Sequence, residues 1–216
     1  MKQSIIDSVK SEKIIVIVRG VARELLVPLA EAMYEGGIRF LEITFDSKGL
    51  VPDEETASRI SMLKEHFGER MHIGAGTVLN TKQVELVARA GGEFIISPNV
   101  KREVIEKTVE LSLVSMPGAL TPSEIADAYD YGADFVKLFP VTSMGASYVK
   151  AVRAPLSHIP MLAVGGVDLN NIADYLAAGV CGFGLGSNII DKKLLEEGDF
   201  DGITRLAKAY VDAVRR

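Results

Sequence analysis

Short apolar runs alternate with longer amphipathic stretches along the chain, and glycine, proline or polar residues separate them. Runs of four or five apolar residues are typical of buried parallel strands, whereas apolar residues three or four apart are typical of helices covering a sheet. Eight strands are predicted, at 14–18, 40–44, 72–75, 94–97, 113–116, 135–139, 161–164 and 182–185. Eight helices are predicted, at 22–35, 54–66, 81–90, 102–111, 122–131, 146–154, 169–178 and 200–214. This alternation predicts a parallel α/β fold.

The length of the chain indicates which parallel fold to expect. Eight units in 216 residues leave about 27 residues for each strand and helix, which suits a compact (β/α)8 barrel with short loops. A dinucleotide-binding sheet would need GxGxxG after its first strand, where this chain has Arg19-Gly20-Val21-Ala22. No linker divides the chain. We therefore expect residues 1–216 to form a single TIM barrel.

The ends of the helices carry recognisable signals. Glycines within 35–37, 90–92, 131–133 and 178–180 are expected to adopt the left-handed conformation just after a helix. Thr81, Thr121 and Asp168 are expected to cap helix N-termini, and Pro122 fits a first helical position.

Composition excludes several classes of protein. The net charge is −5 and basic residues are scattered, which disfavours nucleic-acid binding. A lone Cys181 excludes a disulfide framework, and His66, His72 and His158 have no metal-ligand spacing, so we expect no metal. Neither a signal peptide nor a membrane-spanning run is visible, and a cytoplasmic location is expected.

Two charged residues interrupt apolar strands. Lys137 lies within FVKLFP and Glu42 within RFLEITF. An unpaired buried charge costs several kcal/mol, so packing alone does not explain them. A structural ion pair between them is one interpretation. The other is catalytic: a lysine in a low-dielectric site has a lowered pKa, and its neutral amine can attack a ketone to form a Schiff base while a carboxylate moves protons.

Further candidate residues lie at strand C-termini, where barrels carry their chemistry. Arg19 could grip a carboxylate or phosphate, although a salt bridge at the rim is also possible. Gly74-Ala75-Gly76-Thr77 would allow close approach of a ligand, or form a tight turn. The glycines of 163–167 and 184–188 predict a phosphate cradle with helix N-termini behind it, rather than two unrelated turns.

These segments resemble the class I aldolases for 2-keto-3-deoxy-6-phosphogluconate (KDPG) and 4-hydroxy-2-oxoglutarate (KHG). The similarity runs in order through IVIVRG at 15, LEITF at 41, GAGTVLN at 74, FIISPN at 94, MPGALTPSE at 116, FVKLFP at 135, VGGV at 164 and GLGSN at 184. It implies a TIM barrel that assembles as a homotrimer, acts without a metal or other cofactor, and serves sugar-acid breakdown of the Entner–Doudoroff type.

The resemblance also implies roles for single residues. Lys137 matches the Schiff-base lysine and Glu42 the acid/base group. The substrate-binding positions follow the same match: Arg19 and Thr77 at the pyruvate carboxylate, Pro98 and Phe139 along the pocket, and Val164, Gly165, Gly166, Gly186 and Ser187 toward the phosphate.

Two positions depart from patterns within this family. Some members have an arginine where this chain has Asp46, which leaves the substrate carboxylate to Arg19. Val164 stands where members acting on the gluconate have threonine, whereas members acting on the galactonate epimer have AVGGV, as here. A missing hydroxyl can alter discrimination between epimers, so both remain candidate substrates.

The resemblance and the residues together predict cleavage of a 2-keto-3-deoxy-6-phospho sugar acid to pyruvate and glyceraldehyde 3-phosphate. Cleavage of 4-hydroxy-2-oxoglutarate to pyruvate and glyoxylate is a further expectation. Two alternatives are a phosphosugar isomerase or epimerase and a non-catalytic domain that binds phosphorylated metabolites. Neither explains a lysine within an apolar strand.

Overall fold

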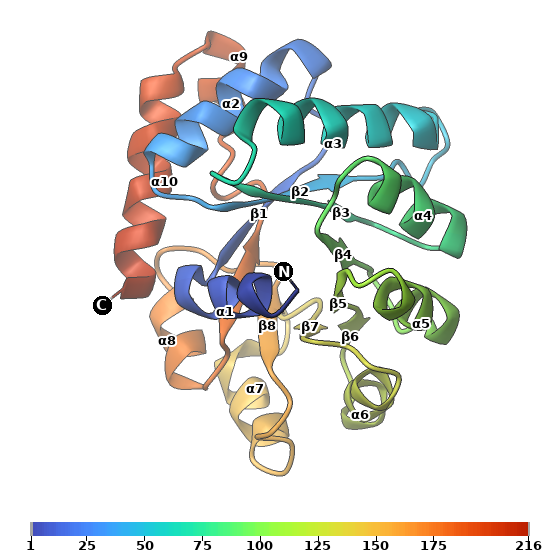
Figure 1. Ribbon diagram of the computed structural model, residues 1–216. Coiled ribbons are helices and arrows are strands. Elements are labelled where there is room, and N and C mark those ends of the chain that lie inside the picture. Colours follow the sequence, from blue (N-terminus) through green and yellow to red (C-terminus); the bar gives the residue numbers. More distant parts are fainter. Residues whose placement is uncertain (1, 216) are drawn as a thin grey trace.

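The computed structural model describes residues 2–215, and its strands lie at the centre of a ring of helices (Figure 1). The strands are β1 (Ile14–Val18), β2 (Phe40–Thr44), β3 (His72–Gly76), β4 (Phe94–Ile96), β5 (Val114–Met116), β6 (Gly118–Ala119), β7 (Val136–Leu138), β8 (Met161–Val164) and β9 (Gly182–Leu185). The helices are α1 (Lys2–Glu12), α2 (Arg23–Glu35), α3 (Asp53–Phe67), α4 (Thr81–Arg89), α5 (Arg102–Glu110), α6 (Pro122–Asp130), α7 (Gly145–Arg153), α8 (Ile172–Ala177), α9 (Lys192–Glu197) and α10 (Phe200–Arg215).

All the strands are parallel and follow the order β5-β4-β3-β2-β1-β9-β8-β7-β6. Only Pro117 separates β5 from β6, and β5 pairs with β4 while β6 pairs with β7. The two short strands together therefore occupy the fifth of the eight strand positions, and the sheet is a nearly closed barrel. The predicted (β/α)8 architecture is confirmed.

Apolar side chains divide between the inside and the outside of the barrel. Successive residues of a strand point to opposite faces. The interior cluster includes Ile15, Phe40, Phe94, Phe135 and Leu162, while their strand neighbours contribute to the larger layer between strands and helices. This alternation fixes which strand positions face the centre of the barrel.

Helix α1 closes the amino-terminal end of the barrel (Figure 1). Its Ile5 and Val9 are buried in the interior cluster, and Lys2 forms a 2.9 Å ion pair with Asp134 just before β7. The apolar interior is thus sealed at this end, which leaves the carboxyl ends of the strands open for a site.

The helix-end predictions were partly correct. Gly37, Gly91, Gly132 and Gly179 all adopt positive φ. Thr121 caps α6 in a capping box with Glu124, and Pro122 is the first helical residue.

Two predicted N-caps were wrong. Asn80, rather than Thr81, caps α4, because its side chain accepts from the Gln83 backbone N–H. Asp168 lies four residues before α8 and accepts from the Asn170 backbone N–H, so it shapes the preceding turn.

Within residues 2–215, no helix combines the length and apolar character needed to cross a membrane.

Candidate active site

Glu42 and Lys137 face the interior of the barrel at its open half. Each lies two residues after a phenylalanine of the interior cluster, Phe40 on β2 and Phe135 before β7, and so points to the same face. Glu42 is 1% exposed and Lys137 is 7% exposed. The structure thus confirms that both charges are buried.

The Glu42 carboxylate has an unusual environment. Its Oε2 has no hydrogen-bond partner, and no ion pair within 4.0 Å joins Glu42 to Lys137 or Arg19. Burial raises the pKa of Glu42 above 4.5, although the positive charges of Lys137 and Arg19 oppose the increase. A structural ion pair is therefore not the reason for this burial. Burial shifts this carboxyl toward its protonated form.

Lys137 experiences the opposite shift. Burial lowers its pKa below 10.5; the Glu42 charge raises it and the Arg19 charge lowers it further. Its Nζ lies 4.6 Å from the centre of the Phe139 ring. Burial thus shifts Lys137 toward the neutral amine and Glu42 toward the protonated carboxyl, the forms in which an amine can act as a nucleophile and a carboxyl as a proton donor.

Arg19 and Thr77 meet across the mouth of the barrel. Arg19 follows β1, and one of its terminal nitrogens donates to Thr77 Oγ1 at 3.2 Å. Thr77 follows β3 with φ +57°, a conformation in which non-glycine residues are rare and which is often retained at functional sites. Arg19 forms no ion pair among the residues described, which disfavours a salt bridge at the rim.

A cavity of about 220 Å³, here called the central cavity, opens above Lys137. Ten of the eleven predicted site residues line it: Arg19, Thr77, Pro98, Lys137, Phe139, Val164, Gly165, Gly166, Gly186 and Ser187. The eleventh, Glu42, lies beneath it, close enough to Lys137 and Arg19 for their charges to act on its pKa. The chain therefore brings the predicted residues together in one place.

Two glycine turns, after β8 and β9, line another part of the cavity. Gly165 and Gly166 have φ of +92° and +79°, and Asn188 Nδ2 donates to the Val167 carbonyl at 2.7 Å, joining the turns after β8 and β9. Helices do follow both turns, as expected, but α8 begins only at Ile172 and α9 only at Lys192, several residues beyond the glycines. Backbone N–H groups, rather than helix ends, are available to an anion here.

The roles of three contributors to the site were not predicted from the sequence. Ile17 lines the central cavity and pairs in register with Glu42, and Asn188 ties the glycine turns. Gly76 leaves the space that the Glu42 carboxylate occupies, since a β-carbon at this position would overlap Glu42 Oε1. The sequence contained a usable signal for Ile17 alone. Ile17 lies between Ile15 and Arg19 in the alternation along and just after β1, and so points to the same face as both.

The described residues offer no group of three or more His, Cys, Asp or Glu side chains that could hold a metal ion. The chemistry available at the central cavity is that of one amine, one carboxyl, one guanidinium and several backbone N–H groups. This set is suited to covalent chemistry on a carbonyl compound that carries anionic groups.

Comparison with known proteins agrees with this site. The model of the KDPG and KHG aldolase family matches residues 5–206. The chain belongs to the KDPG/KHG aldolase family. It is 34% identical to the 2-dehydro-3-deoxy-6-phosphogalactonate aldolase of Escherichia coli K12, across 94% of this chain and 96% of that one.

Solved structures share the fold of this chain. A KDPG aldolase from Legionella pneumophila, with pyruvate captured as a covalent carbinolamine intermediate, superposes with a TM-score of 0.84 at 26% identity over 97% of both chains. A chain of a porous protein cage, which was designed by fusing symmetric oligomeric domains, superposes with a TM-score of 0.84. It is 34% identical over 94% of this chain and 72% of that one.

Asp46 has a structural task in this member of the KDPG/KHG aldolase family. Its carboxylate accepts from the backbone N–H groups of Lys48, Leu50 and Val51 at 2.7–3.1 Å, which folds the loop between β2 and α3. These hydrogen bonds hold the pKa of Asp46 below 3.8. An anion here cannot take the place of a carboxylate-binding arginine.

Proposed function

We propose that this protein is a class I aldolase that reversibly cleaves a 2-keto-3-deoxy-6-phospho sugar acid to pyruvate and glyceraldehyde 3-phosphate. The observation that carries the proposal is the buried Lys137 amine beside Glu42, at the base of the central cavity. Membership of the KDPG/KHG aldolase family, and the pyruvate carbinolamine in the Legionella relative, support it.

Two sets of residues that line the cavity suit the two anionic groups of such a substrate. Arg19 and Thr77 offer a guanidinium and a hydroxyl to the carboxylate of the keto acid. Pro98 and Phe139 line the space around the Lys137 amine. The N–H groups and hydroxyl of the Gly165-Gly166 and Gly186-Ser187 turns are assigned to the phosphate.

The residues support the following sequence of steps. The neutral amine of Lys137 adds to the C2 carbonyl, and the Glu42 carboxyl donates a proton to the hydroxyl that leaves as water. In the resulting protonated imine, the Glu42 carboxylate accepts the C4 hydroxyl proton, and the C3–C4 bond breaks as the C4 carbonyl forms. The electron pair of that bond enters the imine to give an enamine, and glyceraldehyde 3-phosphate departs. Glu42 returns the proton to C3 of the enamine. Water then hydrolyses the protonated imine to pyruvate and the neutral Lys137 amine, and Glu42 takes up the proton that is released.

A panel of substrates tests this function. We expect the enzyme to release pyruvate from the gluconate or galactonate form of the phosphorylated keto acid, in a coupled assay with lactate dehydrogenase. The same rates are expected in EDTA, since Lys137 and Glu42 supply the chemistry without a cofactor. Adding 4-hydroxy-2-oxoglutarate to the panel shows whether glyoxylate is also a product. Absence of pyruvate from all three compounds would refute the proposal.

Val164 is proposed to influence which epimer is preferred. It ends β8, lines the central cavity and lies over Gly184, where a β-carbon would come within 2.9 Å of Val164 Cγ2. Val164→Thr introduces a hydroxyl of similar size. We expect the ratio of kcat/KM for gluconate over galactonate to rise by about tenfold, as one additional hydrogen bond allows. An unchanged ratio would show that Val164 does not discriminate.

The buried Lys137 predicts the pH dependence of pyruvate capture. The unprotonated amine reacts, so the initial rate should rise with pH through the lowered pKa of Lys137, with a midpoint below 10.5. Glu42→Gln removes the negative charge that raises the pKa of Lys137, and the midpoint should then move to lower pH. Trapping with cyanoborohydride and mass spectrometry measures both. A midpoint at 10.5, or an upward shift in Glu42→Gln, would contradict the assignment.

We also propose that the protein assembles as a homotrimer. Three exposed large apolar side chains, Leu50, Met144 and Leu169, lie in loops that follow β2, β7 and β8. A related chain served as a symmetric oligomeric component of a designed cage. Light scattering should give three times the chain mass of 23.3 kDa. A monomer at micromolar concentration would refute the proposal.

The proposed reaction suggests a setting. Phosphorylated sugar acids are intracellular intermediates, and the free Cys181 fits a reducing compartment, so we place the enzyme in the cytoplasm. Sugar-acid breakdown of the Entner–Doudoroff type would supply the phosphorylated keto acid and consume the two three-carbon products.

A further inference from the structure

A second cavity, of about 350 Å³, lies beside the central cavity at the ends of β1 and β2. The loop between β2 and α3 covers it. Three cationic side chains line it, Arg19, Lys48 and Arg59, against the single carboxylate of Asp46. That carboxylate is already bonded to three backbone N–H groups of the loop. The second cavity therefore has excess positive charge.

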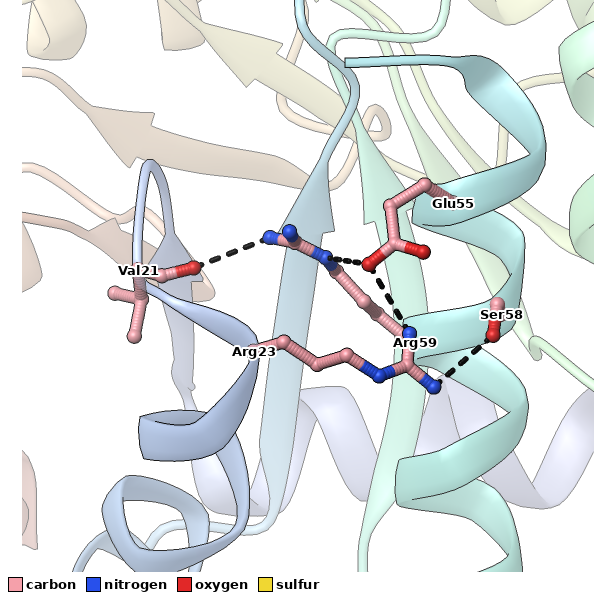
Figure 2. Close-up of polar contacts among 5 residues, drawn as sticks. All are labelled: Val21, Arg23, Glu55, Ser58 and Arg59. Carbon is pink, nitrogen blue, oxygen red and sulfur yellow. Dashed lines mark hydrogen bonds and ion pairs between the residues drawn. The ribbon is translucent and has the colours of Figure 1, made fainter.

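Arg59 is held rigidly at this cavity. Figure 2 shows its guanidinium extending from α3 to the loop after β1, where a terminal nitrogen donates to the Val21 carbonyl at 3.1 Å. Its Nε donates to Glu55 at 2.9 Å, and Arg23 donates to the same Glu55 oxygen at 3.1 Å. One carboxylate thus serves two arginines. The other terminal nitrogen of Arg59 has no partner among the residues described.

Two more donors at the cavity are unused. Thr56 is only 2% exposed and lines the cavity, yet its hydroxyl makes no hydrogen bond to any residue in 2–215. Lys48 forms no ion pair with a described residue, although its charge lies close enough to Asp46 to lower the pKa of that carboxyl. Among the described residues only Glu42 Oε2 is a fully buried side-chain oxygen or nitrogen without a partner, so the unbonded Thr56 hydroxyl is open to the cavity and available to a ligand.

We propose that the second cavity binds a phosphate group, either inorganic phosphate or the head of a small phosphomonoester. A phosphate offers three or more acceptor oxygens and up to two negative charges. The fixed guanidinium of Arg59 and the Thr56 hydroxyl on α3, together with the unpaired ammonium of Lys48 in the loop before α3, line the cavity and match that acceptor set. The site is distinct from the glycine turns of the central cavity, with which it shares Arg19 alone.

The shared Arg19 couples the two cavities. Its guanidinium lines both, and the proposed function assigns it to the substrate carboxylate; this part of the inference rests on that function. Two anions on either side of one guanidinium repel each other and compete for its donors. Phosphate in the second cavity should therefore weaken pyruvate binding, and pyruvate should weaken phosphate binding by the same factor.

Calorimetric titration tests the site on the full-length protein. Inorganic phosphate and glycerol 3-phosphate are titrated in separate arms into a Ser187→Glu background, in which a carboxylate repels phosphate from the glycine turns. We expect one binding event to remain. Thr56→Val and Lys48→Gln should each weaken it by about tenfold, as loss of one hydrogen bond to a charged group does. Lys208→Gln, which removes an exposed charge on α10, is the matched control and should leave it unchanged.

The outcomes separate this site from the aldolase itself. If Ser187→Glu abolishes all phosphate binding, or if Thr56→Val and Lys48→Gln bind as tightly as Lys208→Gln, the second cavity is not a phosphate site. The arm that binds more tightly identifies free phosphate or a phosphomonoester as the ligand. Borohydride trapping of pyruvate is then repeated with and without added phosphate. In the Ser187→Glu background, added phosphate should lower the rate of trapping. The decrease should be smaller when Thr56→Val is also present. Failure to trap pyruvate at all would count against the aldolase function, without bearing on phosphate binding.

Discussion

Replacing Lys137 with alanine is expected to abolish covalent capture of pyruvate and to lower turnover by about 10³-fold or more, as loss of a covalent nucleophile does. The protein is incubated with pyruvate and borohydride, and its intact mass is measured. Wild type should gain the mass of one reduced pyruvate, and peptide mapping should place it on Lys137. No other residue lining the central cavity carries an amine. The variant should therefore gain none.

Two further variants show whether the loss of capture comes from the missing amine, from the missing positive charge, or from general damage to the protein. Lys137→Arg keeps a cation beside Glu42 but has no amine of suitable pKa, so it should also fail to capture pyruvate. Lys208→Ala removes an exposed lysine on α10 and should behave as wild type. Undiminished capture in Lys137→Ala, or an adduct mapped to another lysine, would exclude the Schiff-base assignment.

The position of this lysine was predictable because the side chains of a strand alternate between two faces. Phe135 is buried in the barrel interior, and two residues later the same face carries Lys137. Phe40 and Glu42 repeat the pattern on β2. A single strand contains all the information needed, since a charge in phase with interior apolar residues must be buried once the barrel closes.

Helices α1 and α9 were not predicted because their apolar content is small. In α1 only Ile5, Ile6 and Val9 are apolar, and their burial depends on the open amino-terminal end of the barrel. Helix α9 spans six residues and has no fully buried side chain. Tertiary contacts rather than a strong periodic pattern account for both.

Contacts between residues of different strands and loops could not be predicted from the sequence either. The contact of Arg19 with Thr77 joins loops 58 positions apart, and the Glu42–Gly76 approach depends on the register of β2 against β3, in which Thr44 pairs with Gly76. The role of Asp46 depends on how the following loop folds back onto its carboxylate. Each relation is set by packing of the whole barrel.

Gly76→Ala is expected to lower turnover by about 10²- to 10³-fold, through Glu42 rather than through Lys137. The new methyl group would occupy the space of the Glu42 carboxylate, so that the acid must move away from the amine it serves. Misplacing a general acid/base group lowers the rate by a factor in this range. Glu42→Gln, measured in the same coupled assay, gives the rate expected when Glu42 contributes nothing to proton transfer.

Gly186→Ala is a matched control for pyruvate capture alone, because Gly186 lines the same cavity but is assigned to the phosphate, which pyruvate lacks. There the nearest atom to an added β-carbon is Ile17 Cβ at 3.9 Å, an ordinary contact, and the backbone lies outside the left-handed region. Its capture of pyruvate should stay within a few-fold of wild type. Combining Gly76→Ala with Glu42→Gln should cost little more than either change alone, because both remove the same group. Full activity in Gly76→Ala, or additive losses in the double variant, would mean that Gly76 does not act by making room for Glu42.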